Sequence, residues 1–333
     1  MNSEPEKNTV LSGSSIPIAA SKMFTYPTRL ASAWKPDIME INLPGYLLER
    51  PEVEIIVRQG STRSIENNSG NIYQKIYRKL TAPMQVDGSY ILDSRYETDG
   101  NIAHMMTGVV PQLLAAKKLV GDKITVVVRS NATSMAKNIY NLLGTSLLCT
   151  DKDIDGKLIL ASQNFMYSYD GWYTTLCADL DFEGLNQHTP EKIFISRKGA
   201  RSLINESEVE QILQTYGFKK YYFEDIPISE QWSVARNAKI VVGVHGAAMA
   251  HLILNRHKVK LIELFHPGYV VDMYRNIAGA VGGSWCAVTG QITQDVIAEL
   301  DFKEQARKFA ATPTRIDINS LQMALEYLEI SAK

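Results

Sequence analysis

Cysteine is scarce in this sequence, and the few cysteines form no cluster. Only Cys149, Cys177 and Cys286 occur among the 333 residues, far apart and without a Cys-x-x-Cys spacing. This scarcity excludes a disulfide-rich scaffold and a cysteine-based zinc site. We therefore predict that all three are small, buried apolar residues.

The sequence also lacks an excess of either charge. Its 35 Lys and Arg residues balance 36 Asp and Glu residues, which gives a formal net charge of −1. This balance argues against a nucleic-acid partner and against a protein whose whole surface attracts an anionic membrane. It is compatible with a local basic patch. With 45% apolar and 21% charged residues, the composition is that of a globular protein. The length predicts two domains, or one large domain with insertions.

Long apolar runs are missing as well. The longest, residues 238–254, contains Gly243, His245 and Gly246, and is typical of a strand, a turn and a helix rather than a membrane span. The first 25 residues contain only a short apolar run at residues 16–20, so no signal peptide is evident. We expect a cytoplasmic protein without a transmembrane segment, and a peripheral membrane contact stays open.

Regular periodicity begins after an irregular, proline-punctuated stretch at residues 1–40. From there, apolar runs typical of strands alternate with helical patterns, which indicates an α/β fold with parallel sheets. We expect two Rossmann-like domains facing a central cleft, over residues 1–185 and 186–333. The last helix, residues 321–328, packs either on the second domain or back on the first, and the sequence leaves both arrangements open.

A basic segment follows the predicted strand at residues 193–195. It places Arg197, Lys198 and Arg201 around Gly199, without an acidic residue nearby. Ligands of open α/β sheets bind beyond the carboxyl ends of the strands, and the planar arginine side chain binds two phosphate oxygens at once. The segment predicts an anion site, and the alternative is a solvated loop with ordinary surface cations.

A second strand, residues 240–244, runs into a turn of small residues. Gly246, Ala247 and Ala248 leave the start of the next helix open, where free N–H groups and the helix dipole bind phosphate. His245 opens this turn and is either a ligand contact or a structural histidine. The turn has neither a GxGxxG pattern nor a Walker A ending, so nicotinamide and ATP chemistry lose support.

Glu263 is the third candidate, on a predicted strand at residues 260–265. A carboxylate among apolar neighbours is costly unless it has partners. Two hydroxyl groups of a ribose would be suitable donors, and the alternative is a salt bridge to a lysine or arginine.

Together these stretches resemble the family 61 glycosyltransferases. Residues 195–201, followed by Asn205 and Glu206, are similar to the family's Ser-Arg segment that leads into Asn-Glu. Residues 242–248 look like its strand, turn and helix, and residues 262–267 like the strand that follows. The resemblance implies a GT-B architecture, inverting stereochemistry and a nucleotide-sugar donor, uridine-diphosphate-linked, on the C-terminal domain.

In the first half, Asn101 and His104 resemble the family's Asn-x-x-His helix, with Ala103 and Met105 in place of the aromatic residues beside that histidine. The helix is predicted over residues 102–119, with a kink or break near Val110 because Pro111 interrupts it.

The resemblance implies that His104 is the general base and that the acceptor is a saccharide bound by the N-terminal domain. Together with the absent signal peptide, it leads us to expect a bacterial member that acts in cell-surface polysaccharide biosynthesis. No cofactor is expected. The predicted donor-binding residues are Arg197, Lys198, Gly199, Arg201, His245, Gly246, Ala247, Ala248 and Glu263.

Two alternatives stay open. Asp-x-Asp pairs at 151/153, 153/155 and 179/181 would suit Mn²⁺ or Mg²⁺ in a metal-dependent transferase. The chain could also be a non-catalytic nucleotide or sugar binder of the same fold, in which His104 does no chemistry.

Overall fold

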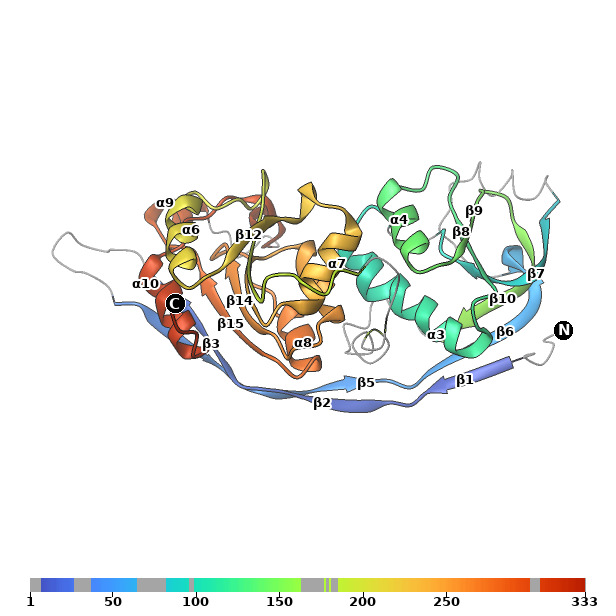
Figure 1. Cartoon of the computed structure of the whole chain (residues 1–333), viewed down its shortest axis with the longest axis horizontal. Helices are drawn as coiled ribbons and strands as arrows, with labels where there is room; N and C mark the ends of the chain where they lie inside the picture. Colours follow the sequence, from blue (N-terminus) through green and yellow to red (C-terminus); the bar gives the residue numbers. More distant parts are fainter. Residues whose placement is uncertain are drawn as a thin grey trace. The chain divides into compact units, whose positions relative to one another are not determined.

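The chain divides into two compact units, each with its own sheet (Figure 1). The computed structural model describes residues 7–26, 37–64, 82–95, 99–162, 177, 180, 185–299 and 306–332. The first unit comprises Met1–Ser15 and Glu49–Glu183, and the second comprises Ile16–Leu48 and Gly184–Lys333.

Residues 1–40 do not form the irregular stretch that we predicted. Their described part contains the strands β1 (Lys7–Leu11), β2 (Ser14–Ile18) and β3 (Ser21–Thr25), and β4 (Met39–Leu43) begins at its end. Residues 16–48 belong to the second unit, whereas the prediction placed them in the first domain. These strands are short and only partly apolar, so their own sequence does not reveal them.

The second unit is built on a sheet with the strand order β12-β11-β13-β14-β15-β3-β4. Neighbouring strands are parallel except β3 and β4, which are antiparallel. The central strands are continuous apolar runs because both faces of the sheet are covered. The strands from the second half are β11 (Lys192–Ser196), β12 (Lys219–Tyr222), β13 (Ile240–Val244), β14 (Lys260–Phe265) and β15 (Ser284–Thr289).

From β11 the chain first forms β12 on one side of β11, and it then crosses to the other side to form β13. The strand order therefore reverses at β11. Loops that follow the strands on either side of such a reversal lie apart and leave room for a ligand between them. The residues after β11 and β13 include the predicted anion site.

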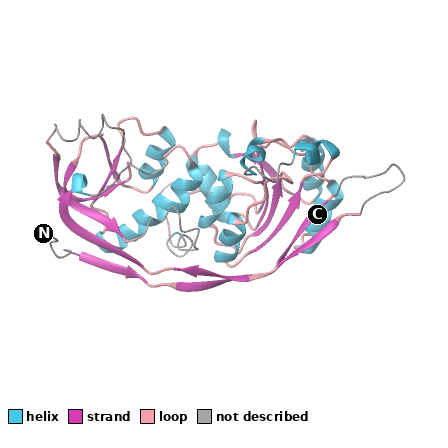
Figure 2. Cartoon of the chain, turned by 180° about the vertical axis from the view of Figure 1, so that it is seen from behind, coloured by secondary structure: helices cyan, strands magenta, loops and turns pink. Residues whose placement is uncertain are grey.

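Helices and 3₁₀ turns cover this sheet (Figure 2). The last helix, α10 (Ile318–Tyr327), packs Leu321 and Leu325 into a buried cluster with Phe24 of β3 and Val288 of β15. It therefore packs within its own unit, on a strand from the first forty residues. The other elements are α6 (Glu206–Thr215), η3 (Phe223–Asp225), α7 (Ile228–Asn237), η4 (Ala247–Leu254), α8 (Met273–Ala280), α9 (Gln294–Glu299) and η5 (Ala306–Ala311).

The first unit has a mixed sheet with the order β1-β6-β10-β7-β8-β9. The last four strands are parallel, as predicted, whereas β6 is antiparallel to both of its neighbours. A separate pair is formed by β2 and β5 (Tyr46–Arg50). The remaining elements are β6 (Val53–Ser61), η1 (Thr62–Ser64), β7 (Met84–Asp93), α2 (Ile102–His104), η2 (Met105–Val109), α3 (Val110–Val120), β8 (Ile124–Val128), α4 (Ser134–Leu142), β9 (Ser146–Cys149) and β10 (Ile154–Ala161).

The cysteines are only partly as predicted. Cys177 and Cys286 are buried, and burial raises the pKa of both thiols. Cys149 is exposed, because it ends β9 at the edge of its sheet.

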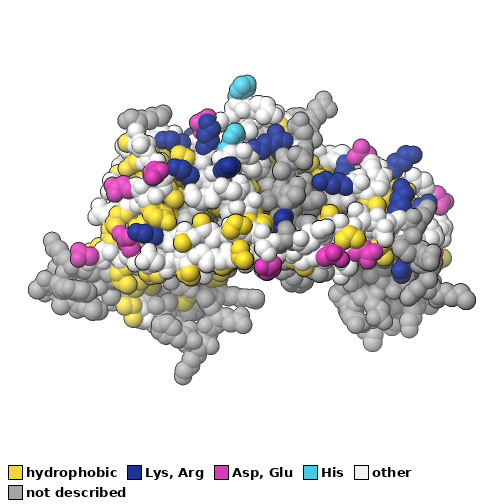
Figure 3. Space-filling view, turned by 90° about the horizontal axis from the view of Figure 1, so that it is seen from below, with side chains coloured by type: hydrophobic (Ala, Val, Ile, Leu, Met, Phe, Trp, Pro, Cys, Tyr) yellow, Lys and Arg dark blue, Asp and Glu magenta, His cyan; other side chains and the backbone are white. Residues whose placement is uncertain are grey.

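None of the described helices is long and apolar enough to cross a membrane. On the face that Figure 3 shows, Lys and Arg side chains lie at several separate places.

Candidate functional site

The strands β11, β13 and β14 bring three of the predicted segments to one edge of the second sheet. Ile195 is in register with Gly243, and Gly243 with Glu263, so the strands reach the edge together. Arg197 follows β11 directly, and His245 follows β13. The backbone N–H of His245 donates to the carbonyl of Leu264 at 2.9 Å, which ties the turn after β13 to β14.

Two arginine side chains converge on one backbone oxygen. Arg201 Nη1 donates to the carbonyl of His245 at 3.3 Å, and Arg197 Nη1 lies 3.5 Å from the same oxygen. Burial lowers the pKa of Arg197, and the neighbouring charge of Arg201 lowers it further. Within the described residues, neither guanidinium forms a salt bridge, so an anion bound here would relieve their repulsion.

The backbone of this arginine loop is strained and held from outside. Arg201 has a φ of 64°, a left-handed conformation that is unusual for a residue with a side chain. The N–H of Arg201 donates to the carbonyl of Ala311 at 3.0 Å, and Leu203 pairs with Thr314. The last residue of η5 and the segment that follows it therefore fix the position of Arg201, and backbone strain held in this way is typical of functional sites.

Gly246 is required by the close approach of Arg197. A Cβ atom at this position would lie 2.2 Å from Arg197 Nη1 and 3.0 Å from its Cζ. The backbone itself is extended, with a φ of 166°, so the requirement is for space rather than for a left-handed turn. The following helix, η4, is a 3₁₀ helix, and Ala247 and Ala248 at its start are partly exposed.

Glu263 does not face a ribose as we predicted. Its carboxylate is completely buried, and its Oε1 lies 2.5 Å from Nδ1 of His245. Its Oε2 accepts a hydrogen bond from Trp285 Nε1 at 2.8 Å. The alternative prediction was a salt bridge from Glu263 to a lysine or arginine. The structure has a histidine and a tryptophan as the hydrogen-bond partners of Glu263 instead.

Lys198 has a partner within the protein that the sequence does not indicate. Its ammonium group pairs with Asp225 at 2.5 Å and lies over the ring of Tyr222. Its side chain is 56% exposed, and Asp225 raises its pKa. Gly199, with a φ of 69°, forms the exposed turn between Lys198 and the second arginine.

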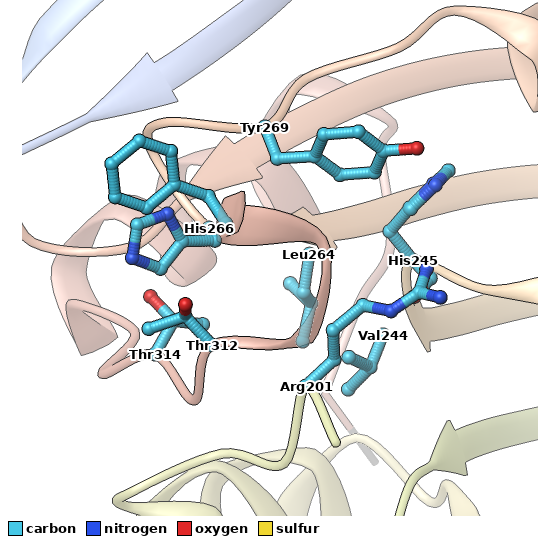
Figure 4. A pocket seen from close by; sticks show the side chains of 9 residues that line it. Arg201, Val244, His245, Leu264, His266, Tyr269, Thr312 and Thr314 are labelled. Carbon is cyan, nitrogen blue, oxygen red and sulfur yellow. The ribbon is translucent and has the colours of Figure 1, made fainter. Parts of the chain in front are cut away.

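A pocket lies beside Arg201 and His245 (Figure 4). His266 stacks on Phe309 at 5.0 Å between ring centres, and the hydroxyl-bearing residues Thr312 and Thr314 lie next to it. His266 belongs to residues 262–267, which resemble the family, whereas sequence reasoning missed Phe309, Thr312 and Thr314 because no motif marks them. They come from segments far along the chain that reach the site only in the folded structure.

Asn205, which the family resemblance includes, connects two segments of the second unit. It precedes α6, but its side chain makes no cap hydrogen bond there. Instead, its Oδ1 accepts from the N–H of Ile316 at 3.0 Å and its Nδ2 donates to the carbonyl of Ile316 at 2.8 Å. Asn205 therefore fastens the segment before α10 to the arginine loop.

His104 lies in the first unit, at the end of α2. The helix begins at Asn101, whose Oδ1 accepts from the N–H of Ala103 at 2.9 Å. A π-helical turn, Met105–Val109, follows His104 directly. We predicted a kink or a break near Val110, and the structure has this π turn directly before α3, whose first residues are Val110 and Pro111. His104 is half-buried, and its ring makes no hydrogen bond within the described residues. Turns of this kind are frequent at functional sites.

The Asp-x-Asp pairs that the structure describes have protein partners. Asp153 is buried and lies 3.0 Å from Arg63, while Asp151 accepts from a serine after β8 and Asp155 from a glutamine of β7. No group of three potential metal ligands is found among the described residues. The pair at 179/181 lies outside them.

Comparison with known proteins bears on this geometry. Residues 102–262 match the family model of glycosyltransferase 61. The match begins two residues before His104, includes both arginines and the turn at Gly246, and ends next to Glu263.

A relative supports the same enzyme class. The chain is 29% identical over 77 residues to the EGF domain-specific O-linked N-acetylglucosamine transferase of Drosophila melanogaster. The alignment covers 22% of this chain, which spans only 15% of the length of the fly protein. Both similarities are to glycosyltransferases, as the sequence motifs predicted.

Proposed function

We propose that this chain is an inverting, metal-independent glycosyltransferase of the GT-B type. It would move a sugar from a uridine-diphosphate-linked donor to a saccharide acceptor in cell-surface polysaccharide biosynthesis. The observation that carries the proposal is the convergence of Arg197 and Arg201 on the His245 carbonyl, beside a glycine that leaves the turn open. The family match supports the enzyme class.

The diphosphate of such a donor gains negative charge as its bond to the sugar breaks. Preorganised cations and N–H groups stabilise that charge without rearranging during the reaction. Arg197 and Arg201 are preorganised in this sense, because a shared acceptor and a fixed backbone hold them.

The acceptor hydroxyl must lose a proton as it attacks the sugar. We assign this step to His104, because an imidazole ring is the side-chain group that most often serves as a general base. Attack from the side opposite the diphosphate inverts the configuration of the sugar carbon.

Metal independence is supported by the partners of the described aspartates. A carboxylate that already pairs with an arginine, as Asp153 does, is a poor ligand for Mn²⁺ or Mg²⁺ unless that pair breaks. The two converging arginines supply the positive charge that the metal would otherwise bring.

A panel of nucleotide sugars tests the proposal directly. At a hundredfold excess over Kd, the true donor should raise the melting temperature by roughly 5–10 °C, with EDTA present throughout. The panel includes uridine-diphosphate N-acetylglucosamine, since N-acetylglucosamine is the sugar in the relative's name. Stabilisation by no nucleotide sugar would contradict the proposal, and stabilisation that EDTA abolishes would contradict metal independence.

Arg197→Ala should weaken the binding of uridine diphosphate by about 2–3 kcal/mol, because it removes a charge-assisted hydrogen bond. Gly246→Ala should have a similar effect by another route, since the added methyl group displaces the Arg197 side chain. Isothermal titration calorimetry measures both affinities.

Lys198→Ala is the matched control, because Lys198 is already paired with Asp225. Gly60→Ala controls for the added methyl group, since a Cβ there meets no atom closer than 4.0 Å. An unchanged affinity in Arg197→Ala would remove the phosphate role of this loop.

A further inference from the structure

The buried ionisable pair at the centre of the site is the feature with the clearest unassigned role. Glu263 is completely buried, so its charge needs a partner inside the protein. The closest charged or chargeable group is Nδ1 of His245, at 2.5 Å. A protonated histidine would neutralise the carboxylate, whereas a neutral histidine would leave it an uncompensated charge.

The sheet explains why these two side chains meet. Glu263 has Gly243 on one side and Ala287 on the other, in register on the neighbouring strands. These small residues leave the carboxylate room on that face of the sheet. His245 lies two residues beyond Gly243, and Trp285 two residues before Ala287, so both side chains point to the same face as Glu263.

Aromatic rings fix the orientation of the histidine. Phe265 stacks on it at 4.9 Å between ring centres, with an angle of 24° between the rings. Tyr269 and Tyr274 lie at 5.5 Å, and Tyr269 extends towards the histidine in the pocket view (Figure 4). The ring nitrogen Nδ1 is taken by Glu263, and Nε2 makes no hydrogen bond within the described residues.

The charges around His245 oppose one another. Glu263 brings a negative charge to the ring itself, whereas Arg197 and Arg201 bring positive charges to the backbone carbonyl of the same residue. Tyr274 stays neutral, because burial and the nearby Glu263 raise its pKa. Glu263 is the only one of these groups in direct contact with the ring nitrogen, so its influence is the strongest.

We propose that Glu263 is a positioning residue that keeps His245 protonated and turned so that Nε2–H donates a hydrogen bond to the diphosphate of the donor. The inference rests on the proposed function, because it needs a diphosphate ligand. It assigns Glu263 an indirect role, through His245, in place of direct contact with the ligand. His245 becomes the third cation of the site, next to Arg197 and Arg201.

Glu263→Gln tests this role, since it removes the charge and keeps the size. The amide can still accept from Trp285 and donate to Nδ1, which leaves a neutral His245 with Nε2–H in place. Affinity for uridine diphosphate should then fall about tenfold, because a charge-assisted hydrogen bond becomes a neutral one. Affinity for uridine, which has no phosphate, should not change, and calorimetry measures both.

A double-variant cycle separates this role from a structural one. In a His245→Gln background, Glu263→Gln should have no further effect on the affinity for uridine diphosphate, because the charge it maintains is already absent. Trp285→Phe is the control, since it removes the other partner of Glu263 and leaves the histidine contact. Its ratio of uridine diphosphate to uridine affinity should equal that of the wild type.

Three results would overturn the inference. They are an unchanged affinity in Glu263→Gln, an equal loss for uridine and uridine diphosphate, and a loss that persists in the His245→Gln background. A wild-type protein that binds no uridine diphosphate would instead refute the proposed function. Thermal melting of each variant shows whether it folds. If Glu263→Gln folds poorly, His245→Gln is compared with the wild type instead, and it should lower the ratio of uridine diphosphate affinity to uridine affinity.

Discussion

His104→Ala is expected to slow sugar transfer by about 10²- to 10⁴-fold and to leave the affinity for uridine diphosphate unchanged. The loss is large because a general base assists the step in which the acceptor hydroxyl attacks. The affinity is retained because His104 belongs to the first unit, whereas the proposed diphosphate ligands belong to the second. The measurement is the release of uridine diphosphate from the donor identified by melting, with calorimetry alongside.

His257→Ala is the control for this experiment, because His257 is an exposed histidine outside the proposed site. Wild-type turnover in His104→Ala would show that another residue, or none, acts as the base. A wild-type protein that binds nucleotide sugars and neither transfers nor hydrolyses them would favour the non-catalytic binder.

Acid is expected to destabilise the protein through His251, which lies on η4. The ring is fully buried and packs against Phe223 at 5.6 Å, and neither of its nitrogens has a hydrogen-bond partner among the residues that the structure describes. Burial lowers its pKa from 6.5 to about 3. Between these two values the unfolded chain binds a proton that the folded protein excludes. Stability is therefore lost as the pH falls from about 6.5 towards 3.

From pH 7 to pH 4 this loss should amount to about 3 kcal/mol for His251 alone. The comparison is denaturant unfolding of the wild type and His251→Leu at both pH values, in which contributions of the other groups cancel. The variant should lose about 3 kcal/mol less than the wild type. His188→Ala, at an exposed position, should behave like the wild type. An equal loss in His251→Leu and the wild type would contradict the assignment.

The parts of the fold that the sequence predicts are those whose signal is local. Strands β11 and β13 contain continuous apolar runs, because each is covered on both faces, and such runs are visible without knowledge of their neighbours. Strand β4 has no such run, since it is an edge strand with exposed residues. Its place in the second sheet depends on a partner, β3, and on β15 from the far end of the chain.

The candidate site divides in the same way. Arg197, Arg201 and Gly246 were predicted together, because ends of parallel strands meet at one edge of a sheet. The ion pair of Lys198 with Asp225 and the contact of Glu263 with Trp285 were not predicted, because Asp225 and Trp285 come from η3 and β15. Which neighbour a side chain contacts depends on elements that pack from elsewhere, and spacing along the chain does not encode it.

The order in which the two units can be completed follows from the path of the chain. The hydroxyl groups of Thr25 and Thr289, 2.6 Å apart, belong to residues separated by 264 positions. Most of the first unit, by contrast, is a continuous stretch from Glu49 to Glu183. On the ribosome, that stretch emerges and can fold while β3 and β4 still lack a sheet to join. The earliest strands of the second unit therefore wait for nearly the whole protein to be synthesised, and they need protection from mispairing during that interval.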